Sequence, residues 1–283
     1  ALMAAPSEVR ADGRRPAMMR QLTTERGLLT RADGSARWEQ DGSVVLAAVY
    51  GPRTIQARKE NTEHLAIEVN YRPASGMQTS MERESEMVLR RTLEQVVLTS
   101  LHPRLGITVV VQIVSADGSL EACVANAACA ALIDAGVPMR GVLCTASCAI
   151  MPGIGLVADP TADEERAATA VATMSYCFRG GKAGEAPPMA LPEAEAEVLQ
   201  TTSNGSMSEE DFLGLAVLGR DAAFSVFEFF KASAKRFHAS KEVDIEGMAR
   251  AAKEAAARSK ELGQGAGFRR TFGGSAASNK PVA

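Results

Sequence analysis

The sequence of 283 residues has no uninterrupted run of 18 apolar residues, so no membrane-spanning helix is expected. It also lacks an excess of basic charge, because 31 Lys and Arg stand against 34 Asp and Glu and the net charge is −3. Any contact with nucleic acid therefore needs a local basic patch. The opening stretch ALMAAPSEVRADGRRP has no apolar core of the kind found in a secretory signal, which favours an intracellular protein.

Histidine and cysteine are scarce, with three and five residues. The cysteines lie in apolar stretches, which is typical of buried free thiols in a reducing compartment. Cys144 and Cys148 have neither a second Cys pair nor a His near them in the sequence, so no metal site is expected. Ser119 lacks the surrounding sequence of a hydrolase nucleophile, and nucleophilic catalysis finds no support.

Patterns of period 2 and period 3.6 predict an α+β fold in which helices pack on mixed β-sheets. A hairpin is expected over 37–50, with its turn at Asp41-Gly42 and its second strand ending at Gly51-Pro52. The run 106–115 is rich in β-branched residues and is predicted to be a strand buried on both faces. Further strands are predicted at 64–72, 142–150, 154–159, 169–178 and about 196–203.

Three helices are predicted within residues 1–238. The first covers 80–101 with a capping box at Thr79 and Glu82, and the second follows Ser119. The third begins at Ser206, with capping-box spacing to Glu209, and carries an apolar stripe of Phe212, Leu215, Leu218, Phe224, Phe227 and Phe230. We interpret residues 1–238 as one domain and residues 239–283 as an Ala-rich helix followed by a disordered basic tail.

One stretch has the form of a phosphate site. In SADGSLEACVANAACAALIDAG (115–136), a strand leads through a turn at Asp117-Gly118 into a helix, and the exposed N–H groups and dipole of a helix start favour anions. The residue just inside this start is an acid, Glu121. Asp117 and Asp163 are candidates for a pair of carboxylates in acid–base or metal chemistry, although Asp is also common in turns.

Several arginines are candidates for contact with an RNA backbone. The alternative is that they decorate helix surfaces and subunit interfaces. The tail pair Arg269-Arg270 lies beside Phe268 and Phe272, an arrangement that suits stacking on RNA as well as a tail with no partner. The candidates in the body of the chain are Arg72, Arg83, Arg90, Arg91 and Arg104.

Four stretches together resemble the RNase PH family over about residues 8–235. They are RADGRRPAMMRQL (10–22), GSARWEQDGSVVLAAVYGP (34–52), the stretch 115–136 quoted above, and GLVADPTADEE (155–165). The resemblance implies a fold like domain two of ribosomal protein S five and assembly into a six-membered ring around an RNA channel. It also implies that active relatives degrade RNA from its 3′ end, with phosphate attacking the last linkage.

The resemblance also shows departures in the active site. Active members carry Gly-Thr-Arg-Thr after the Asp-Gly turn, and this chain has Ser119-Leu120-Glu121-Ala122. Asp163 matches the first catalytic Asp, whereas the second position, six residues later, is Thr169. A further family arginine aligns near Met81, where Arg83 is the nearest substitute. Exchanging a cation for a carboxylate turns attraction of phosphate into repulsion, so we interpret the phosphate site as dismantled.

These observations lead to the hypothesis of a non-catalytic structural subunit of the eukaryotic RNA exosome core ring, in the nucleus, nucleolus and cytoplasm. Its expected partners are RNA and other RNase PH-like ring subunits, with a subunit of the exosome component eight type as nearest neighbour. No cofactor is expected. The alternatives are a phosphorolytic 3′-to-5′ exoribonuclease, which needs inorganic phosphate, and a homodimeric RNA- or DNA-binding nuclease acting outside the ring.

Overall fold

The computed structural model describes residues 10, 12–56, 58, 60–179 and 196–265, with side chains as far as Phe237. The chain divides into two units, residues 1–233 and 234–283. The second unit continues helix α4 (Glu209–Gly265). The basic tail expected after it, with Arg269 and Arg270, lies outside the described residues.

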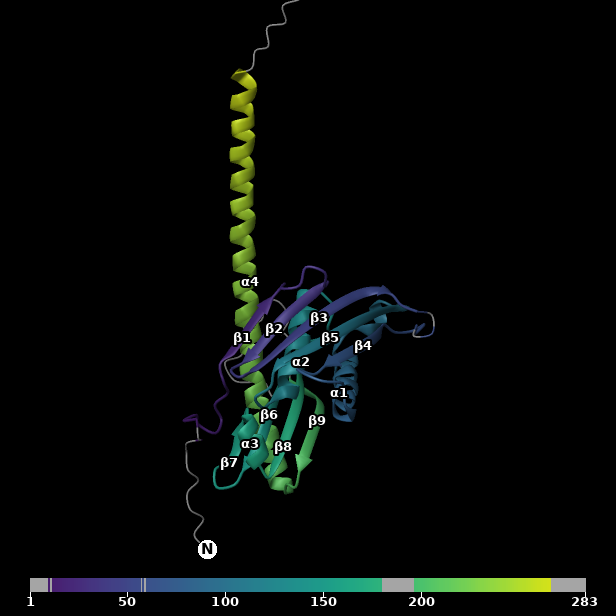
Figure 1. The fold of residues 1–283 in the computed structure, drawn as a ribbon, viewed down its shortest axis with the longest axis vertical. Coiled ribbons are helices and arrows are strands. Elements are labelled where there is room, and N and C mark those ends of the chain that lie inside the picture. The colour runs from purple at the N-terminus through teal and green to yellow at the C-terminus, as the bar shows by residue number, and fades with distance from the viewer. Residues whose placement is uncertain (1–9, 11, 57, 59, 180–195, 266–283) are drawn as a thin grey trace, which may run out of the picture. The chain divides into compact units, whose positions relative to one another are not determined.

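The first unit contains two β-sheets (Figure 1). The first has the order β1-β2-β3-β5-β4, with all neighbours antiparallel except the parallel pair β4 and β5. The second is antiparallel with the order β7-β6-β8-β9. The strands are β1 (Leu22–Arg26), β2 (Gly34–Gln40), β3 (Ser43–Thr54), β4 (Ala66–Arg72), β5 (Leu105–Ser115), β6 (Val142–Met151), β7 (Gly155–Ala158), β8 (Ala170–Phe178) and β9 (Ala196–Gly205).

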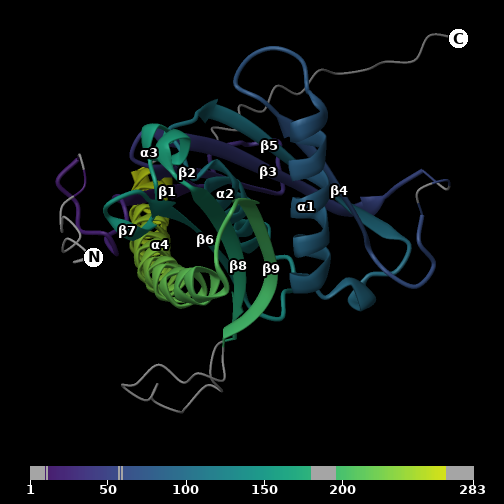
Figure 2. The ribbon, with the colours of Figure 1, turned by 90° about the horizontal axis from the view of Figure 1, so that it is seen from below.

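Helix α2 (Leu120–Asp134) lies between the two sheets and contacts β2, β3 and β6 (Figure 2). Helix α1 (Ser80–Val96) packs against β4 and β9. The first part of α4 packs on the second sheet, where Gly214 lies against Leu156 of β7 and the hydroxyl of Tyr176 donates a hydrogen bond to the carbonyl of Ala216 (2.9 Å). A short helix, α3 (Ala162–Ala167), precedes β8. The architecture confirms the predicted α+β fold.

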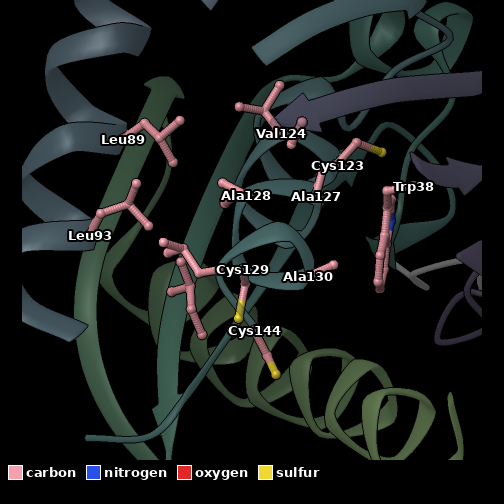
Figure 3. Packing of buried hydrophobic residues seen from close by; sticks show 14 of the residues in the cluster. Trp38, Leu89, Leu93, Cys123, Val124, Ala127, Ala128, Cys129, Ala130 and Cys144 are labelled. Carbon is pink, nitrogen blue, oxygen red and sulfur yellow. The ribbon is translucent and has the colours of Figure 1, made fainter. Parts of the chain in front are cut away.

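The core is built around α2, whose small side chains let both sheets approach it closely. Figure 3 shows its alanines and cysteines between Trp38 of β2 and Leu89 and Leu93 of α1. Trp38 also meets the rings of Phe229 and Phe230 on α4, with centroids 5.4 and 5.0 Å away. All five cysteines are buried and free, as predicted. Burial raises the pKa of the Cys129 thiol to about 12, which keeps it protonated and unreactive.

The predicted hairpin is confirmed, but two expectations about its sheet were wrong. Strand β3 does not end at Gly51-Pro52: it continues to Thr54 after a shift in register between Tyr50 and Arg53, which accommodates a proline that donates no hydrogen bond. Strand β5 is buried on one face only, and Val114 on its other face is 58% exposed. The helices that cover this sheet pack on a single face.

Two helix boundaries also differ from the predictions. The capping box of α1 is confirmed, but the helix ends at Val96, because Val97 is extended and pairs with Met139, and Leu101 belongs to a separate 3-10 turn. Helix α4 begins at Glu209, not at Ser206. Residues 204 and 205 stay paired with β8, and the side chain of Ser208 accepts the N–H of Asp211 instead.

The apolar stripe predicted for the third helix is confirmed except at one position. Leu215, Phe227 and Phe230 are buried, and Leu218 and Phe224 pack partly buried against the core. Phe212, in the first turn of α4, is 37% exposed.

Candidate anion site at the start of helix α2

The turn before α2 is held by close contact with the loop after β7. Gly118 has φ +74°, and a Cβ there would lie 2.5 Å from the carbonyl oxygen of Pro160, so only glycine fits. Ser119, the N-cap of α2, is buried with φ 50°, and its hydroxyl donates to the same carbonyl (3.0 Å). The helix therefore begins inside the protein, against the segment that leads into α3.

The backbone N–H of Ser119 already has an anionic partner. It donates to Oε1 of Glu165 at 2.7 Å, and Glu165 lies in α3, 46 residues further along the chain. The start of a helix attracts negative charge because its N–H groups and dipole are unsatisfied there. In this protein a carboxylate of the same chain fills that role.

Glu121 adds a second carboxyl group at the same place. Burial raises its pKa, and the negative charges of Glu165 and Glu84 raise it further, while a hydrogen bond with Ser85 opposes the change. Burial likewise raises the pKa of Glu165, against the hydrogen bond from Ser119. We call Ser119, Glu121 and Glu165 the α2 entrance. Two carboxyl groups therefore stand together at the start of the helix.

On the other side of the turn, two arginines pair with two other acids, Asp159 and Glu164. Arg20 donates from Nε and from its backbone N–H to Oδ2 of Asp159 (2.9 Å each) and from Nη2 to Oδ1 (2.7 Å). It also donates to the carbonyl oxygens of Asp117 (2.6 Å) and Gly118 (3.3 Å). Burial alone would raise the pKa of Asp159, but the hydrogen bonds and charge of Arg20 outweigh it and lower the pKa.

A second buried arginine holds the neighbour of Glu165. Arg10 donates from Nε to Oε1 of Glu164 (2.7 Å) and from Nη1 to the carbonyl of Ala158 (2.7 Å). Burial would raise the pKa of Glu164, yet the hydrogen bond and charge of Arg10 lower it. We call Arg10, Arg20, Asp159 and Glu164 the N-terminal clamp. It fixes Arg10 and Arg20 to the segment that carries Glu165.

Most other residues of the predicted site lie away from the α2 entrance, although Asp117 is close enough for its charge to raise the pKa of Glu165. Asp163 is 92% exposed at its side chain and pairs with Arg166 (2.8 Å) on the surface of α3. Asp117 lies 3.7 Å from Nη1 of Arg20. Thr169 is exposed just before β8, and Leu120 and Ala122 turn toward the core. A carboxylate pair of Asp117 and Asp163 stays a prediction, with each of the two held by a different arginine.

The candidate RNA-contacting arginines lie in three places. Arg83, Arg90 and Arg91 are exposed on α1, where Arg83 and Arg90 lie seven residues apart and therefore on one stripe, and Arg90 lies 3.7 Å from Glu94. Arg104 precedes β5 with φ 64° and lies 3.8 Å from Glu60. Arg72 ends β4, and within the described part of the chain its side chain has no ion-pair partner.

Arg72 borders a polar hollow of about 410 Å³ between the end of β4 and α1. The loop around it is held from two sides: Gln112 donates to the carbonyl of Pro73 (3.0 Å), and Gln78 donates to Glu86 (2.9 Å). The sequence showed the arginine but not the hollow, which forms only where the loop folds back on α1.

Sequence reasoning missed Glu165 as a residue of the site, since the family pattern drew attention to Asp163 two residues earlier. Among the residues that the structure describes, no three His, Cys, Asp or Glu side chains gather in a way that could hold a metal ion. No helix in the described ranges is both long and apolar enough to cross a membrane.

Comparison with known proteins agrees with this fold. Residues 18–138 match the model of the 3′ exoribonuclease family, domain 1 (RNase PH). The chain is 37% identical over 229 residues to the exosome complex exonuclease RRP46 homolog of Arabidopsis thaliana, covering 78% of this chain and 94% of that one. The corresponding protein of Oryza sativa is 34% identical over 230 residues, which cover 81% of this chain and 97% of that one.

Solved structures give the same picture. The crystal structure of rice Rrp46 superposes with a TM-score of 0.69 at 34% identity, covering 79% of this chain and 99% of that one. An Archaeoglobus fulgidus exosome chain, from a structure with RNA bound to the active site, has a TM-score of 0.64 at 19% identity and shares the fold; the match covers 78% of this chain and 92% of that one. The identity to the plant RRP46 homologues, over nearly their full length, shows that this chain belongs to the 3′ exoribonuclease (RNase PH) family.

Proposed function

We propose that this protein is a non-catalytic structural subunit of the eukaryotic RNA exosome core ring, where it supports 3′-to-5′ RNA processing and degradation. The observation that carries the ring-subunit part of the proposal is the 37% identity to an RRP46 homologue over 94% of that protein. The proposed neighbours are other RNase PH-like ring subunits, the nearest of the exosome component eight type. The proposed location is the nucleus and nucleolus, and also the cytoplasm.

The proposal of a silent site is supported by the acids at the α2 entrance. Phosphorolysis requires cations and donors around an attacking phosphate. Here the helix start presents Glu121 and Glu165, and the Ser119 N–H is already bonded to a carboxylate. Inorganic phosphate would have to displace that carboxylate and approach a second one.

RNA contact is proposed at Arg72. Its guanidinium is exposed, lacks an ion-pair partner among the described residues, and borders the polar hollow. A guanidinium suits a phosphate of the RNA backbone because it donates two parallel hydrogen bonds. Arg83 and Arg91 on α1 are further candidates.

One experiment tests the ring and the chemistry together. The tagged full-length protein is expressed with the other ring subunits of its own organism and purified, and both the complex and the protein alone are incubated with single-stranded RNA with and without phosphate. We expect a stable complex and no release of nucleoside diphosphates by the protein alone.

The rival functions predict different results. Diphosphate release that needs phosphate and is lost in Asp163→Ala would establish the phosphorolytic enzyme. A self-dimer that takes up no ring subunit and cleaves RNA or DNA without phosphate would establish the nuclease outside the ring. Either result overturns the silent-subunit proposal.

A further inference from the structure

We propose that Glu165 is a built-in occupant of the anion-binding end of α2, so that this end stays closed to phosphate even when the charge at Glu121 is reversed. The inference rests on the proposed function, because it concerns the same silent site. It adds that two acids from different helices, Glu121 of α2 and Glu165 of α3, exclude phosphate, and that Glu165 occupies the place of the ligand.

The position of Glu165 is set by contacts on both sides of it. The preceding loop cannot move away from the turn, because Gly118 packs against Pro160 and Ser119 bonds to it. The adjacent Glu164 accepts hydrogen bonds from Arg10 and from the backbone N–H of Thr161 (2.8 Å), which caps α3. With these groups fixed, the carboxylate of Glu165 reaches the Ser119 N–H at 2.7 Å.

An occupant from the same chain is hard to displace. Glu165 is already ordered at the helix start, whereas a free phosphate loses translational and rotational freedom on binding. A cation placed at position 121 would attract phosphate to the entrance but would leave the Ser119 N–H occupied. The two acids should therefore act separately, one by repulsion and one by occupation.

The test measures binding of inorganic phosphate to the isolated full-length protein by calorimetric titration at neutral pH and low salt. The variants are Glu121→Arg alone and combined with Glu165→Ala or Glu165→Gln. Glutamine removes the charge but keeps an oxygen that accepts the Ser119 N–H, whereas alanine frees the N–H. The matched control is Glu121→Arg with Glu210→Gln, which removes an exposed acid from the first turn of α4. Circular dichroism checks the fold of each variant.

We expect Glu121→Arg/Glu165→Ala to bind phosphate at least tenfold more tightly than Glu121→Arg, with Glu165→Gln in between and the Glu210→Gln control equal to Glu121→Arg. Equal affinity for Glu121→Arg with and without Glu165→Ala would overturn the proposal. Equal affinity for the glutamine and alanine variants would also overturn it, because charge alone would then exclude phosphate. If Glu121→Arg unfolds, Glu121→Gln replaces it throughout with the same expected order.

The result is independent of ring assembly. A protein that joins no ring subunit would overturn the proposed function, yet it would leave the order of these phosphate affinities unchanged.

Discussion

The N-terminal clamp and the α2 entrance lie side by side and place acids in opposite surroundings. In the clamp, Asp159 and Glu164 face arginines, and their pKa values are lowered. At the entrance, burial raises the pKa values of Glu121 and Glu165, and the charge of Arg20 only partly opposes this rise at Glu165. Glu164 and Glu165 are consecutive residues of one short helix. Whether a buried acid stabilises this region therefore depends on whether folding brings an arginine into hydrogen-bond contact with it, and not on the residue type.

The largest effect is expected from Arg20→Met. It removes both side-chain hydrogen bonds to the buried carboxylate of Asp159, leaves Arg14 at 3.5 Å as its nearby cation, and takes the side-chain donor from the carbonyl of Asp117, so the free energy of unfolding should fall by about 3–5 kcal/mol. Urea denaturation at neutral pH measures the change. The control is Arg53→Met, whose pair with Asp33 is half exposed and should contribute at most about 1 kcal/mol. Equal losses in the two variants would contradict the role given to the clamp.

The neighbouring substitutions Glu164→Gln and Glu165→Gln should differ in sign. Glu164→Gln removes the charge that Arg10 needs and should cost about 3 kcal/mol near neutral pH. Because the pKa of Glu164 is lowered in the folded protein, this contribution is present above pH 4.5 and is lost as the pH falls through the folded pKa. Glu165→Gln should change stability little or raise it. Denaturation curves of both variants from pH 7 to pH 4 give the comparison, and a loss in Glu165→Gln as large as in Glu164→Gln would contradict it.

A smaller gain is expected from Glu121→Gln. The pKa of Glu121 is raised in the folded state, so ionisation above the unfolded value of 4.5 destabilises the fold. The substitution should raise the free energy of unfolding by about 1 kcal/mol at neutral pH, because it removes a partly buried charge that Glu165 and Glu84 also repel. The gain should vanish below pH 4.5, where the acid is protonated in both states. A gain that persists in acid would assign the effect to packing instead of charge.

Elements with strong local signals were predicted well from the sequence. The Asp41-Gly42 turn and the capping box of α1 form as expected, and the strand predicted at 64–72 forms as β4 over Ala66–Arg72. The ends of helices and strands that depend on pairing with a segment distant in the sequence were not predicted. Val97 leaves the helix because it pairs with Met139, and residues 204–205 stay in a strand because β8 lies beside them.

For the site, the sequence by itself determined that an acid, Glu121, stands where active relatives carry a cation, since the order of residues along the chain is enough to show it. It also determined the small side chains of α2 that let two sheets close on one helix. Only the tertiary structure decided that Glu165, and not Asp163, meets the start of α2, and that Glu164 beside it meets an arginine 154 residues away. The physical reason is that the charge state and the partner of a buried acid depend on groups brought together by folding, and no spacing in the sequence encodes those contacts directly.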